Sequence, residues 1–313
     1  MNGKAHSVKP VIKWAGGKTQ LLDTIDSFLP QEVKNGEISR YIEPFVGGGA
    51  VFAYFINNYN LKSSYIGDIN KVLIITYQVI KNSLQSLIDE LRELERLYYT
   101  SNNEQRKILF YDIRSNFNLQ KREIDNRKIQ ESWIKIAADF IFLNRTCYNG
   151  LFRVNNKGEF NVPFSYYDKP NILNEKNLKD FSSLIKNTTL ISGDFTKCQK
   201  YINKNSFIYL DPPYRPISYT SSFTSYSNFG FSDADHKRLW SFFKKADKKG
   251  AKVMLCNSDP SELMPNDTYI EDLYSEYLIK RITARRSINC MGMKRGDISE
   301  LIITNYDENS PKK

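Results

Sequence analysis

The chain has few of the residues that build disulfide frameworks, metal sites or membrane spans. Its four cysteines are widely spaced, with no Cys-x-x-C, at Cys147, Cys198, Cys256 and Cys290. We therefore expect reduced thiols rather than a disulfide framework. The two histidines, His6 and His236, lie in no Cys/His cluster, so no metal site is expected. No run of about 18 apolar residues occurs, which argues against a transmembrane helix.

An apolar signal-peptide core is also missing, so a cytoplasmic location is expected. Acidic residues are outnumbered, with 45 Lys and Arg against 35 Asp and Glu, a net charge of +10. Together with an aromatic content of 13%, this balance favours a nucleic-acid partner that offers both phosphates and stackable rings. The alternative is an ordinary solvated basic surface. A monomer is expected.

Two glycine motifs lack a residue that familiar nucleotide sites require. Gly17-Lys18-Thr19 imitates the end of a P-loop, but position 12 is Ile12 instead of glycine, which argues against ATP hydrolysis. The loop Phe45-Val46-Gly47-Gly48-Gly49 would need another glycine at position 52 to bind a dinucleotide, and this residue is Phe52. Hydride transfer with NAD is therefore disfavoured.

What the chain does contain is Asp211-Pro212-Pro213-Tyr214, directly after the apolar run Phe207-Ile208-Tyr209-Leu210. The prolines lack backbone donors, so carbonyls in this segment are expected to be free acceptors. Asp211 adds a further acceptor and Tyr214 adds a ring face. Acceptors beside a stacking ring suit a planar amino group, such as N6 of adenine. The alternative is a strand that ends in a proline turn, with Asp211 as a cap.

Further segments are typical of a nucleoside site. The glycine loop lets the backbone approach a ligand closely, although a helix-start turn could need the same glycines. Asp68 follows about 20 residues later, the spacing of a carboxylate that binds ribose hydroxyls, although it could also be a capping residue. Trp14, two glycines and Lys18 could close over a nucleoside and meet a carboxylate, or form a surface turn.

Apolar periodicity predicts an α/β fold in which strands alternate with helices. Strands are expected at 41–42, 64–69, 190–191, 207–210, 252–256 and 301–303. A helix is expected over 83–98 with Ser83 as its N-cap, and a buried helix over 132–144. Residues 101–131 are expected on the surface. Residues 145–170 suit a β-hairpin that turns near Asn156-Lys157-Gly158.

In their order along the chain, these motifs resemble the Dam family of DNA adenine-N6 methyltransferases. The matching segments are Lys13-Trp14-Ala15-Gly16-Gly17-Lys18, Pro44-Phe45-Val46-Gly47-Gly48-Gly49, Asp68, Gly193-Asp194-Phe195, Asp211-Pro212-Pro213-Tyr214, Cys256-Asn257-Ser258 and Arg285-Arg286-Ser287-Ile288. Any one segment is weak evidence, but the ordered set spans nearly the whole chain and is specific.

The resemblance implies an S-adenosylmethionine-dependent methyltransferase with a Rossmann-like mixed sheet. Residues 1–75 and 186–313 would form the catalytic domain, and residues 76–185 an inserted, mainly helical target-recognition domain, called the insert below. The residues implied to bind the cofactor are Trp14, Lys18, Phe45, Gly47, Asp68, Asp194, Phe195 and Asp211. The catalytic residues would be Asp211, Pro212 and Tyr214, and the resemblance calls for no metal and no covalent enzyme intermediate, so Cys147 is not expected to be a nucleophile.

Residues 145–165, called the reading hairpin, resemble the segment with which the family reads GATC in double-stranded DNA. Arg153 can donate two hydrogen bonds to guanine, and Tyr148 and Leu151 can wedge between bases or contact a thymine methyl. The other expected DNA contacts are Arg145, Asn149, Lys157 and Pro163. Ser165 departs from the glycine common in the family, and a structural hairpin with scattered basic residues is the alternative.

Two other functions stay open from the sequence. The chain could be a DNA-binding regulator with an inactive methyltransferase fold. It could also methylate RNA or a protein amide, because the acceptor geometry at Asp211 suits any planar amine or amide.

Overall fold

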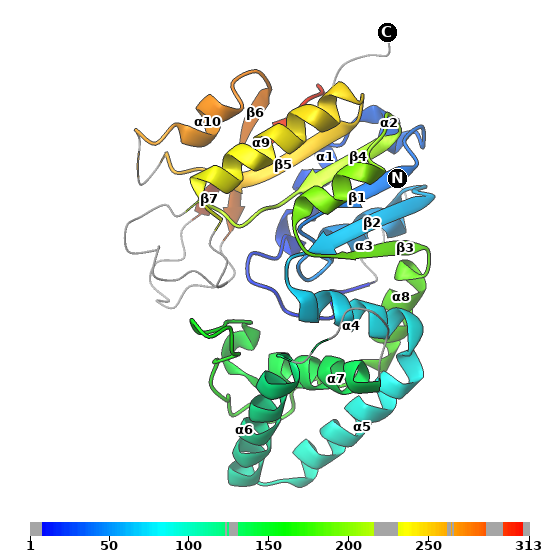
Figure 1. Ribbon diagram of the computed structural model, residues 1–313, viewed down its shortest axis with the longest axis vertical. Helices are drawn as coiled ribbons and strands as arrows, with labels where there is room; N and C mark the ends of the chain where they lie inside the picture. Colours follow the sequence, from blue (N-terminus) through cyan, green and yellow to red (C-terminus); the bar gives the residue numbers. More distant parts are fainter. Residues whose placement is uncertain are drawn as a thin grey trace.

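A seven-stranded sheet forms the centre of the computed structural model (Figure 1), which describes residues 8–122, 124, 131–215, 231–261, 264, 266–285 and 297–308. The strands lie in the order β3-β2-β1-β4-β5-β7-β6. Their bounds are β1 Arg40–Glu43, β2 Ser63–Asp68, β3 Thr188–Ser192, β4 Ser206–Leu210, β5 Lys252–Ser258, β6 Leu278–Arg285 and β7 Asp297–Thr304. β7 is antiparallel to β5 and β6, whereas β1 to β5 pair in parallel, so the predicted mixed α/β sheet is confirmed.

The strand order reverses at the boundary between β1 and β4. From β1 the chain adds β2 and β3 on one side, and it then returns to place β4 and β5 on the other side. Both β1 and β4 end at the same edge, since they are parallel. Open α/β sheets bind ligands outside the carboxyl ends of the strands at such a reversal. The glycine loop follows β1 and Asp211 follows β4, so both lie at this position.

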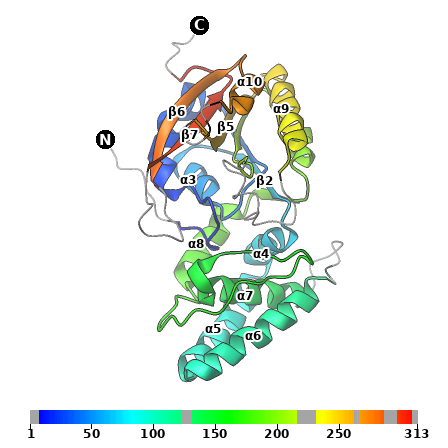
Figure 2. The same cartoon turned by 90° about the vertical axis from the view of Figure 1, so that its left-hand side faces the viewer.

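Successive residues of the central strands face two separate layers of the core. Tyr41 and Phe207 point to the layer that contains α3 (Ala50–Asn58), where both rings contact Phe55. Ile42 and Ile208 point to the opposite layer, which contains α9 (Asp233–Lys248). Figure 2 shows α3 and α9 on opposite faces of the sheet. This alternation is the period of two that a strand buried on both faces requires.

Between β2 and β3 the chain forms a layer of helices, which lies beneath the sheet in Figure 1. These helices are α4 Lys71–Asn82, α5 Leu84–Thr100, α6 Asn103–Gln120, α7 Glu131–Thr146 and α8 Glu175–Ile185. α7 packs against α4, α5 and α6 and is the centre of this layer. The remaining short helices are η1 Thr19–Leu21, α1 Leu22–Ser27, α2 Gln31–Lys34, η2 Tyr148–Gly150, η3 Phe195–Tyr201 and α10 Tyr269–Leu273.

The helix predictions are confirmed, apart from the capping role of one residue. The buried helix over 132–144 is α7, and the helix over 83–98 is α5. Ser83 occupies the N-cap position of α5, but its side chain makes no capping hydrogen bond. Residues 101–131 were expected to form helix and loop on the surface, and α6 is such a helix, with one apolar stripe that includes Phe110 and Phe117 buried against the rest of the helical layer. The polar composition of α6 hid this narrow apolar stripe.

The proposed division into domains stays a prediction. Its first boundary, between residues 75 and 76, falls inside α4, and its second coincides with the end of α8 at Ile185. Among the described residues, none of the helices is both long and apolar enough to cross a membrane.

The reading hairpin doubles back on itself as predicted, but without regular strands. The pairing of its two arms is limited to the isolated antiparallel bridges Cys147–Phe164 and Val154–Phe160, with further contacts between side chains such as Arg153 and Asn161. The turn lies where it was expected, because the Asn155 side chain accepts hydrogen bonds from the backbone N–H groups of Lys157 and Glu159.

Side chains of α6 bind the outer edge of the second arm. The Asn118 side chain accepts a hydrogen bond from the Phe160 N–H at 2.8 Å and donates one to the Phe160 carbonyl at 3.1 Å. Arg114 donates to the Val162 carbonyl. The backbone groups of Phe160 and Val162 are therefore satisfied by α6, whereas Asn161 and Pro163 form backbone hydrogen bonds with Arg153 and Tyr148 of the first arm.

Candidate active site

A buried ion pair lies at the carboxyl end of β4, next to the point where the strand order reverses. Lys18 Nζ is 3.1 Å from Asp211 Oδ1 and donates a hydrogen bond to the carbonyl of Gly16 at 3.0 Å. The same Nζ lies 4.6 Å from the ring centroid of Tyr214. Three of the sequence-predicted residues, which come from distant parts of the chain, therefore meet in one place.

The charges of this site are coupled. Burial alone lowers the pKa of Lys18, but the carboxylates of Asp211 and Glu300 outweigh burial and raise it. Burial also raises the pKa of Asp211, and the Lys18 ammonium counteracts part of that effect. The two carboxylates thus favour the charged form of Lys18, and its ammonium favours the charged form of Asp211 against the effect of burial.

Glu300 anchors Tyr214. The Tyr214 hydroxyl donates a 2.9 Å hydrogen bond to Glu300 Oε2. Glu300 reaches this edge of the sheet because β7 runs antiparallel, which pairs Glu300 with Ser258 at the end of β5. Burial raises the pKa of Glu300, while the nearby Lys18 ammonium opposes the rise. The tyrosine ring is therefore fixed at both its backbone and its hydroxyl.

The glycine loop after β1 lies beneath Trp14. Gly47 has a φ of 47°, and a Cβ at this position would come within 2.8 Å of Trp14 Cδ1. Its N–H donates to Asp68 Oδ2 at 3.1 Å, and its carbonyl accepts a 2.6 Å hydrogen bond from Tyr77. The loop is thus a rigid cradle in which only glycine fits.

Asp68 ends β2 beside this cradle. Its Oδ1 accepts a hydrogen bond from the N–H of Asn70 at 2.8 Å, and the Ile69 N–H is a third backbone donor, which leaves the carboxylate with acceptor capacity to spare. Burial raises the pKa of Asp68 to about 6, although its backbone hydrogen bonds lower it. A buried carboxylate with spare acceptors fits a ligand that carries hydroxyl groups.

Three phenylalanines form an aromatic cluster next to the glycine loop. The ring centroids of Phe45 and Phe195 are 5.4 Å apart, and Phe231 lies 5.9 Å from Phe45 and 6.2 Å from Phe195. Phe45 and Phe231 are half-buried, so two rings of the cluster reach the solvent. Such a cluster offers apolar ring faces to a flat ligand.

Asp194 lies beside this cluster as the N-cap of η3. Its side chain accepts a hydrogen bond from the Thr196 N–H at 3.0 Å, and it forms a 2.8 Å ion pair with Arg238. Burial opposes ionisation of Asp194, but the hydrogen bonds from Thr196 and Arg238 prevail and lower its pKa. The carboxylate therefore stays charged.

Most of the predicted DNA contacts share an exposed segment of the reading hairpin. Arg153 is exposed, and its Nε donates to Asn161 Oδ1 at 2.9 Å, which aims the guanidinium without burying it. Tyr148 is 55% exposed, which is unusual for a tyrosine and leaves its ring available to a partner. Lys157 lies exposed at the turn.

The foot of the hairpin presents the other three predicted contacts. Asn149 is exposed and takes a positive φ of 58°, and its N–H donates to the hydroxyl of Tyr167. Pro163 is exposed and Leu151 is half-buried.

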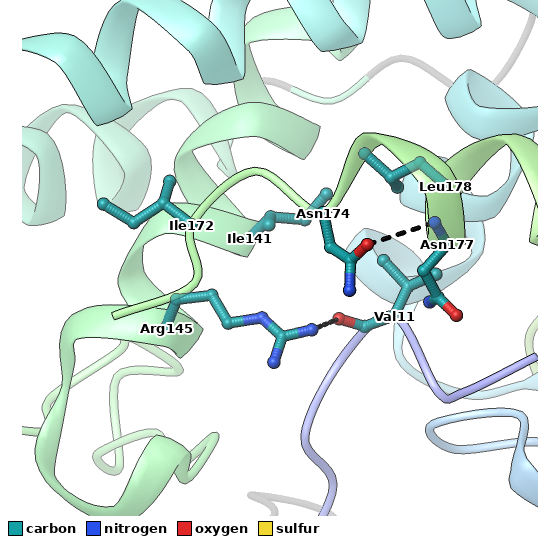
Figure 3. Close-up of a pocket in the computed structure, with 7 residues that line it drawn as sticks. All are labelled: Val11, Ile141, Arg145, Ile172, Asn174, Asn177 and Leu178. Atoms are coloured by element: carbon teal, nitrogen blue, oxygen red, sulfur yellow. Dashed lines mark hydrogen bonds between the residues drawn. The ribbon is translucent and has the colours of Figure 1, made fainter. Parts of the chain in front are cut away.

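Arg145 is placed differently from the other predicted DNA contacts. Figure 3 shows its guanidinium pointing at the backbone of Val11, whose carbonyl accepts a 2.7 Å hydrogen bond from Nη2. Burial lowers the pKa of this guanidinium. The residue lines a small pocket between α7, α8 and the N-terminal segment, together with Val11, Ile141, Ile172, Asn174, Asn177 and Leu178. A DNA contact by Arg145 stays a prediction, to which the structure adds this structural role.

Two expected segments lie largely or wholly outside the described residues. The aromatic loop from Arg215 to Phe231 is described only at its two ends, and Arg286-Ser287-Ile288 is not described. Within the described part of the chain, no group of three or more His, Cys, Asp or Glu side chains could hold a metal ion. Cys147 is fully buried, and burial raises its pKa to about 12, which makes it a poor nucleophile.

Sequence reasoning missed Glu300, Phe231 and Arg238. Glu300 precedes an apolar run in a strand and carries no motif. Phe231 was noted only as the end of an aromatic loop, and Arg238 is one basic residue among many on α9. Only the fold brings these side chains next to the motif residues.

Comparison with known proteins decides the family. Residues 14–288 match the family described as D12 class N6 adenine-specific DNA methyltransferase, which covers most of the 313-residue chain. The chain belongs to this family. The observed fold and the motif order agree with this assignment. Membership of the family makes the protein a DNA methyltransferase that acts on adenine.

Several curated relatives match this methyltransferase over nearly its whole length. "Type II methyltransferase M.MjaIII" of Methanocaldococcus jannaschii is 48% identical, with 96% of this chain and 99% of the relative covered. "Type II methyltransferase M1.LlaDCHI" of Lactococcus lactis subsp. cremoris is 36% identical, with 96% of each chain covered. "DNA adenine methylase" of Vibrio cholerae is 34% identical, with 93% of this chain and 94% of the relative covered.

Proposed function

We propose that this methyltransferase transfers the methyl group of S-adenosylmethionine to N6 of adenine within GATC in double-stranded DNA. The observation that carries the proposal is the meeting of Lys18, Asp211 and Tyr214 beside the glycine loop, where the strand order reverses. A methyl acceptor held by Asp211 lies next to the position where a nucleoside cofactor fits best.

The cradle around Gly47 and the buried Asp68 carboxylate fit such a cofactor. The residues proposed to hold it are Trp14, Lys18, Phe45, Gly47, Asp68, Asp194, Phe195 and Asp211. Asp68 would accept hydrogen bonds from the ribose hydroxyls, and the rings of Phe45 and Phe195 would cover the adenine. When bound, S-adenosylmethionine supplies an electrophilic methyl group on its sulfonium.

The target adenine would be taken up next to this cofactor site. A base inside a duplex is out of reach, so the adenine must leave the stack. The Tyr214 ring would stack on it, while the Asp211 carboxylate and the Pro212 carbonyl would accept hydrogen bonds from N6. These acceptors turn the nitrogen lone pair toward the methyl donor and stabilise the positive charge that develops on N6.

Lys18 already occupies the contacts that this adenine would use. Its ammonium donates toward Asp211 and lies over Tyr214, as the proposed amino group of the base would.

GATC is proposed because the reading hairpin resembles the segment that reads this site in the family. Arg153 would contact guanine through two hydrogen bonds, and Tyr148, Asn149, Leu151 and Pro163 would contact the neighbouring bases. Lys157, at the turn, would contact a phosphate, because lysine acts as a point charge. A monomer in the prokaryotic cytoplasm stays a prediction, and light scattering would measure the oligomeric state.

Incubation with labelled S-adenosylmethionine and a duplex that carries a single GATC tests the proposal. The expected product is N6-methyladenine at that site, and its absence would refute the activity. Asp211→Asn keeps the shape of the side chain but replaces one acceptor by a donor. We expect its rate of transfer to fall by at least about 10²-fold, with duplex affinity retained.

Site preference is tested with duplexes that differ from GATC by one base pair. Arg153→Ala should lose about 1–3 kcal/mol of discrimination against a changed guanine. An unchanged preference would remove Arg153 from its reading role. Competition by RNA, and a glutamine-containing peptide as substrate, would separate DNA methylation from the other acceptors.

A further inference from the structure

Residues 8–18, called the N-terminal strap, cross from the helical layer to the glycine loop. Side chains of the insert form hydrogen bonds with the backbone of the strap at every second residue. The Asn177 side chain accepts from the Lys9 N–H and donates to the Lys9 carbonyl, both at 2.9 Å. Arg145 donates to the Val11 carbonyl (Figure 3), and Asn144 binds Lys13. The strap is therefore held as an edge strand is held, but by side chains.

Asn144 binds the reading hairpin as well as the strap. Its Oδ1 accepts from the Lys13 N–H at 2.8 Å, and its Nδ2 donates both to the Lys13 carbonyl at 3.0 Å and to the Gly150 carbonyl at 2.9 Å. Asn144 is almost completely buried. One amide thus joins the strap to the foot of the reading hairpin, and it uses all its donors and its acceptor to do so.

Two further contacts join the strap to the hairpin beside Asn144. Gly150 has a φ of +64°, and a Cβ at this position would clash with the Lys13 side chain. The Trp14 ring stacks on Phe152 of the hairpin, with centroids 5.5 Å apart and planes at 12°. The hairpin and the strap therefore lie in close contact along Lys13 and Trp14.

The strap then continues directly into the proposed catalytic site. Between Trp14 and Lys18 the chain makes a tight turn, in which Gly17 N–H donates to the Trp14 carbonyl and Lys18 Nζ donates to the Gly16 carbonyl. Trp14 lies on Gly47 at one end of this turn, and Lys18 meets Asp211 at the other. A shift of the hairpin at Gly150 would therefore move Lys18 through a short and rigid path.

We propose that Asn144 is a positioning residue, which couples the reading hairpin to the Trp14–Lys18 turn. Contacts of the hairpin with the correct DNA sequence fix Gly150, Asn144 transmits that position to Lys13, and the turn then places Lys18 relative to Asp211. Asn144 itself contacts neither DNA nor cofactor. The inference rests on the proposed function and adds a route by which site recognition sets the rate of transfer.

The chain offers a matched control for this role. Asn177→Ala removes the same pair of backbone hydrogen bonds from the same strap, but at Lys9, away from the hairpin. Asn144→Ala removes the bonds at Lys13 and Gly150. Asn144→Asp keeps the acceptor for the Lys13 N–H and loses the donors, so it reports on coupling where the alanine variant is too unstable to purify.

Transfer rates on GATC and on a duplex with one outer base pair changed provide the main readout. For Asn144→Ala, and to a smaller extent for Asn144→Asp, kcat on GATC should fall by about tenfold to a hundredfold. The rate on the changed duplex should stay within about threefold of the wild-type rate. The preference for GATC over the changed duplex is then lost because kcat on GATC falls. The affinity for S-adenosylhomocysteine without DNA, measured by calorimetry, should also stay within about threefold, and Asn177→Ala should keep the wild-type preference.

An equal fall on both duplexes, or the same loss of preference in Asn177→Ala, would overturn the inference, because either result marks a purely structural role. An unchanged Asn144→Ala would overturn it as well.

Hydrogen exchange separates this inference from the proposed function. In the wild type, a GATC duplex should slow amide exchange in both 148–153 and 12–18. In the Asn144 variants only 148–153 should be slowed. Wild-type protein without methyl transfer on any duplex refutes the proposed function, yet this exchange pattern would still support the coupling. Residues 12–18 that stay unprotected in the wild type, or stay protected in the variants, would overturn it.

Discussion

Lys18 carries its charge into a buried site because carboxylates surround it. Asp211 and Glu300 raise its pKa against the effect of burial, and Lys18 in turn keeps Asp211 available as a charged acceptor. Removing one partner of a buried pair leaves an uncompensated charge, which costs more than an exposed pair contributes. Substitution of Lys18, Asp211 or Glu300 should therefore displace the charged side chains that remain, and the displacement should lower the rate of transfer.

Glu300 is the first residue to test in this respect. Glu300→Ala leaves the Tyr214 hydroxyl without its acceptor, and should raise the activation free energy of transfer by about 1–3 kcal/mol. Glu300→Gln keeps an acceptor and should lose less. Single-turnover rates measure both effects. In a Tyr214→Phe background the Glu300→Ala effect should shrink, and full additivity in this double-mutant cycle would contradict the proposed anchoring.

Asp68 should make cofactor affinity depend on pH. Hydroxyl groups of a ligand donate to the ionised carboxylate, and burial raises the pKa of Asp68 to about 6. As the pH falls from 7 to 5 the carboxylate becomes protonated, so affinity for S-adenosylhomocysteine should fall, approaching about tenfold per pH unit below the pKa. Calorimetry across this range measures the effect.

Asp68→Asn provides the control for the pH effect. It should bind more weakly and lose the Asp68 contribution to the pH dependence, because Asp194, whose pKa is lowered, stays ionised throughout and any slope that remains belongs to Asp211, whose pKa burial raises. A variant that kept the wild-type slope would assign the titration to another group.

The motif residues could be assigned from sequence because their chemistry is local: two prolines and a tyrosine after a strand, or glycines before a helix. Glu300 could not be assigned in this way. Its role depends on the antiparallel direction of β7, which brings the start of a late strand to the end of an earlier one. No spacing within the chain indicates this contact.

At the scale of single elements, α6 acts as the support of the reading hairpin. Asn118 and Arg114 hold the second arm of the hairpin by its backbone at Phe160 and Val162. These residues lie one helical turn apart, so they project from the same face of α6. The hairpin keeps its shape through this helix more than through its own pairing.

Asn118→Ala should therefore loosen the hairpin without unfolding the protein. The loss of both hydrogen bonds to Phe160 should lower the free energy of local opening by about 1–3 kcal/mol. Hydrogen exchange of residues 155–162 measures this change. Asn82→Ala is the control, because the Asn82 amide donates only within its own helix, to Gln78. Similar exchange in the two variants would show that α6 does not support the hairpin.

Elements with strong periodicity were the ones that sequence could predict. α7 is buried on nearly every side and reads as a continuous apolar run, and the strands around Tyr41 and Ile208 read as short apolar runs. The hairpin forms isolated bridges instead of its expected ladder, and side chains of α6 bind the outer edge of its second arm. Propensity describes what a segment prefers by itself, and it contains no information about such partners.

At the scale of the whole molecule, one hydrophobic cluster joins the sheet to the helical layer. It contains Tyr41 and Phe207 from the sheet together with Phe110, Phe117 and Phe160 from the insert. The second cluster, on the α9 face, is joined to the first by the central strands. The predicted insert therefore shares its core with the catalytic part.

This shared core should make the chain unfold in a single transition. Trp133 lies in α7 and Trp240 in α9, so two variants that each keep one of these tryptophans report on opposite ends of the molecule. Their fluorescence midpoints in urea should coincide with each other and with the midpoint from circular dichroism. Separate midpoints would show that residues 76–185 unfold as a domain of their own.

The order of motifs along the chain was enough to predict the mixed sheet and its family. The strap could not be predicted, because single asparagines inside helices carry no periodic signal and their backbone partners are far away in sequence. These hydrogen bonds between distant parts of the chain are visible in the fold and cannot be predicted from any local pattern.

Synthesis of the chain gives the strap a further consequence. The hydrogen-bond partner of Lys13 is Asn144, which is synthesised 131 residues later. The partner of Lys9 is Asn177, which is synthesised 168 residues later. The partner of the Tyr214 hydroxyl is Glu300, which is synthesised 86 residues after Tyr214. A growing polypeptide on the ribosome therefore holds Trp14 and Lys18 untethered until α7 and α8 have been made. The enzyme becomes competent only when its last strand has emerged, so an incomplete chain is not expected to modify DNA.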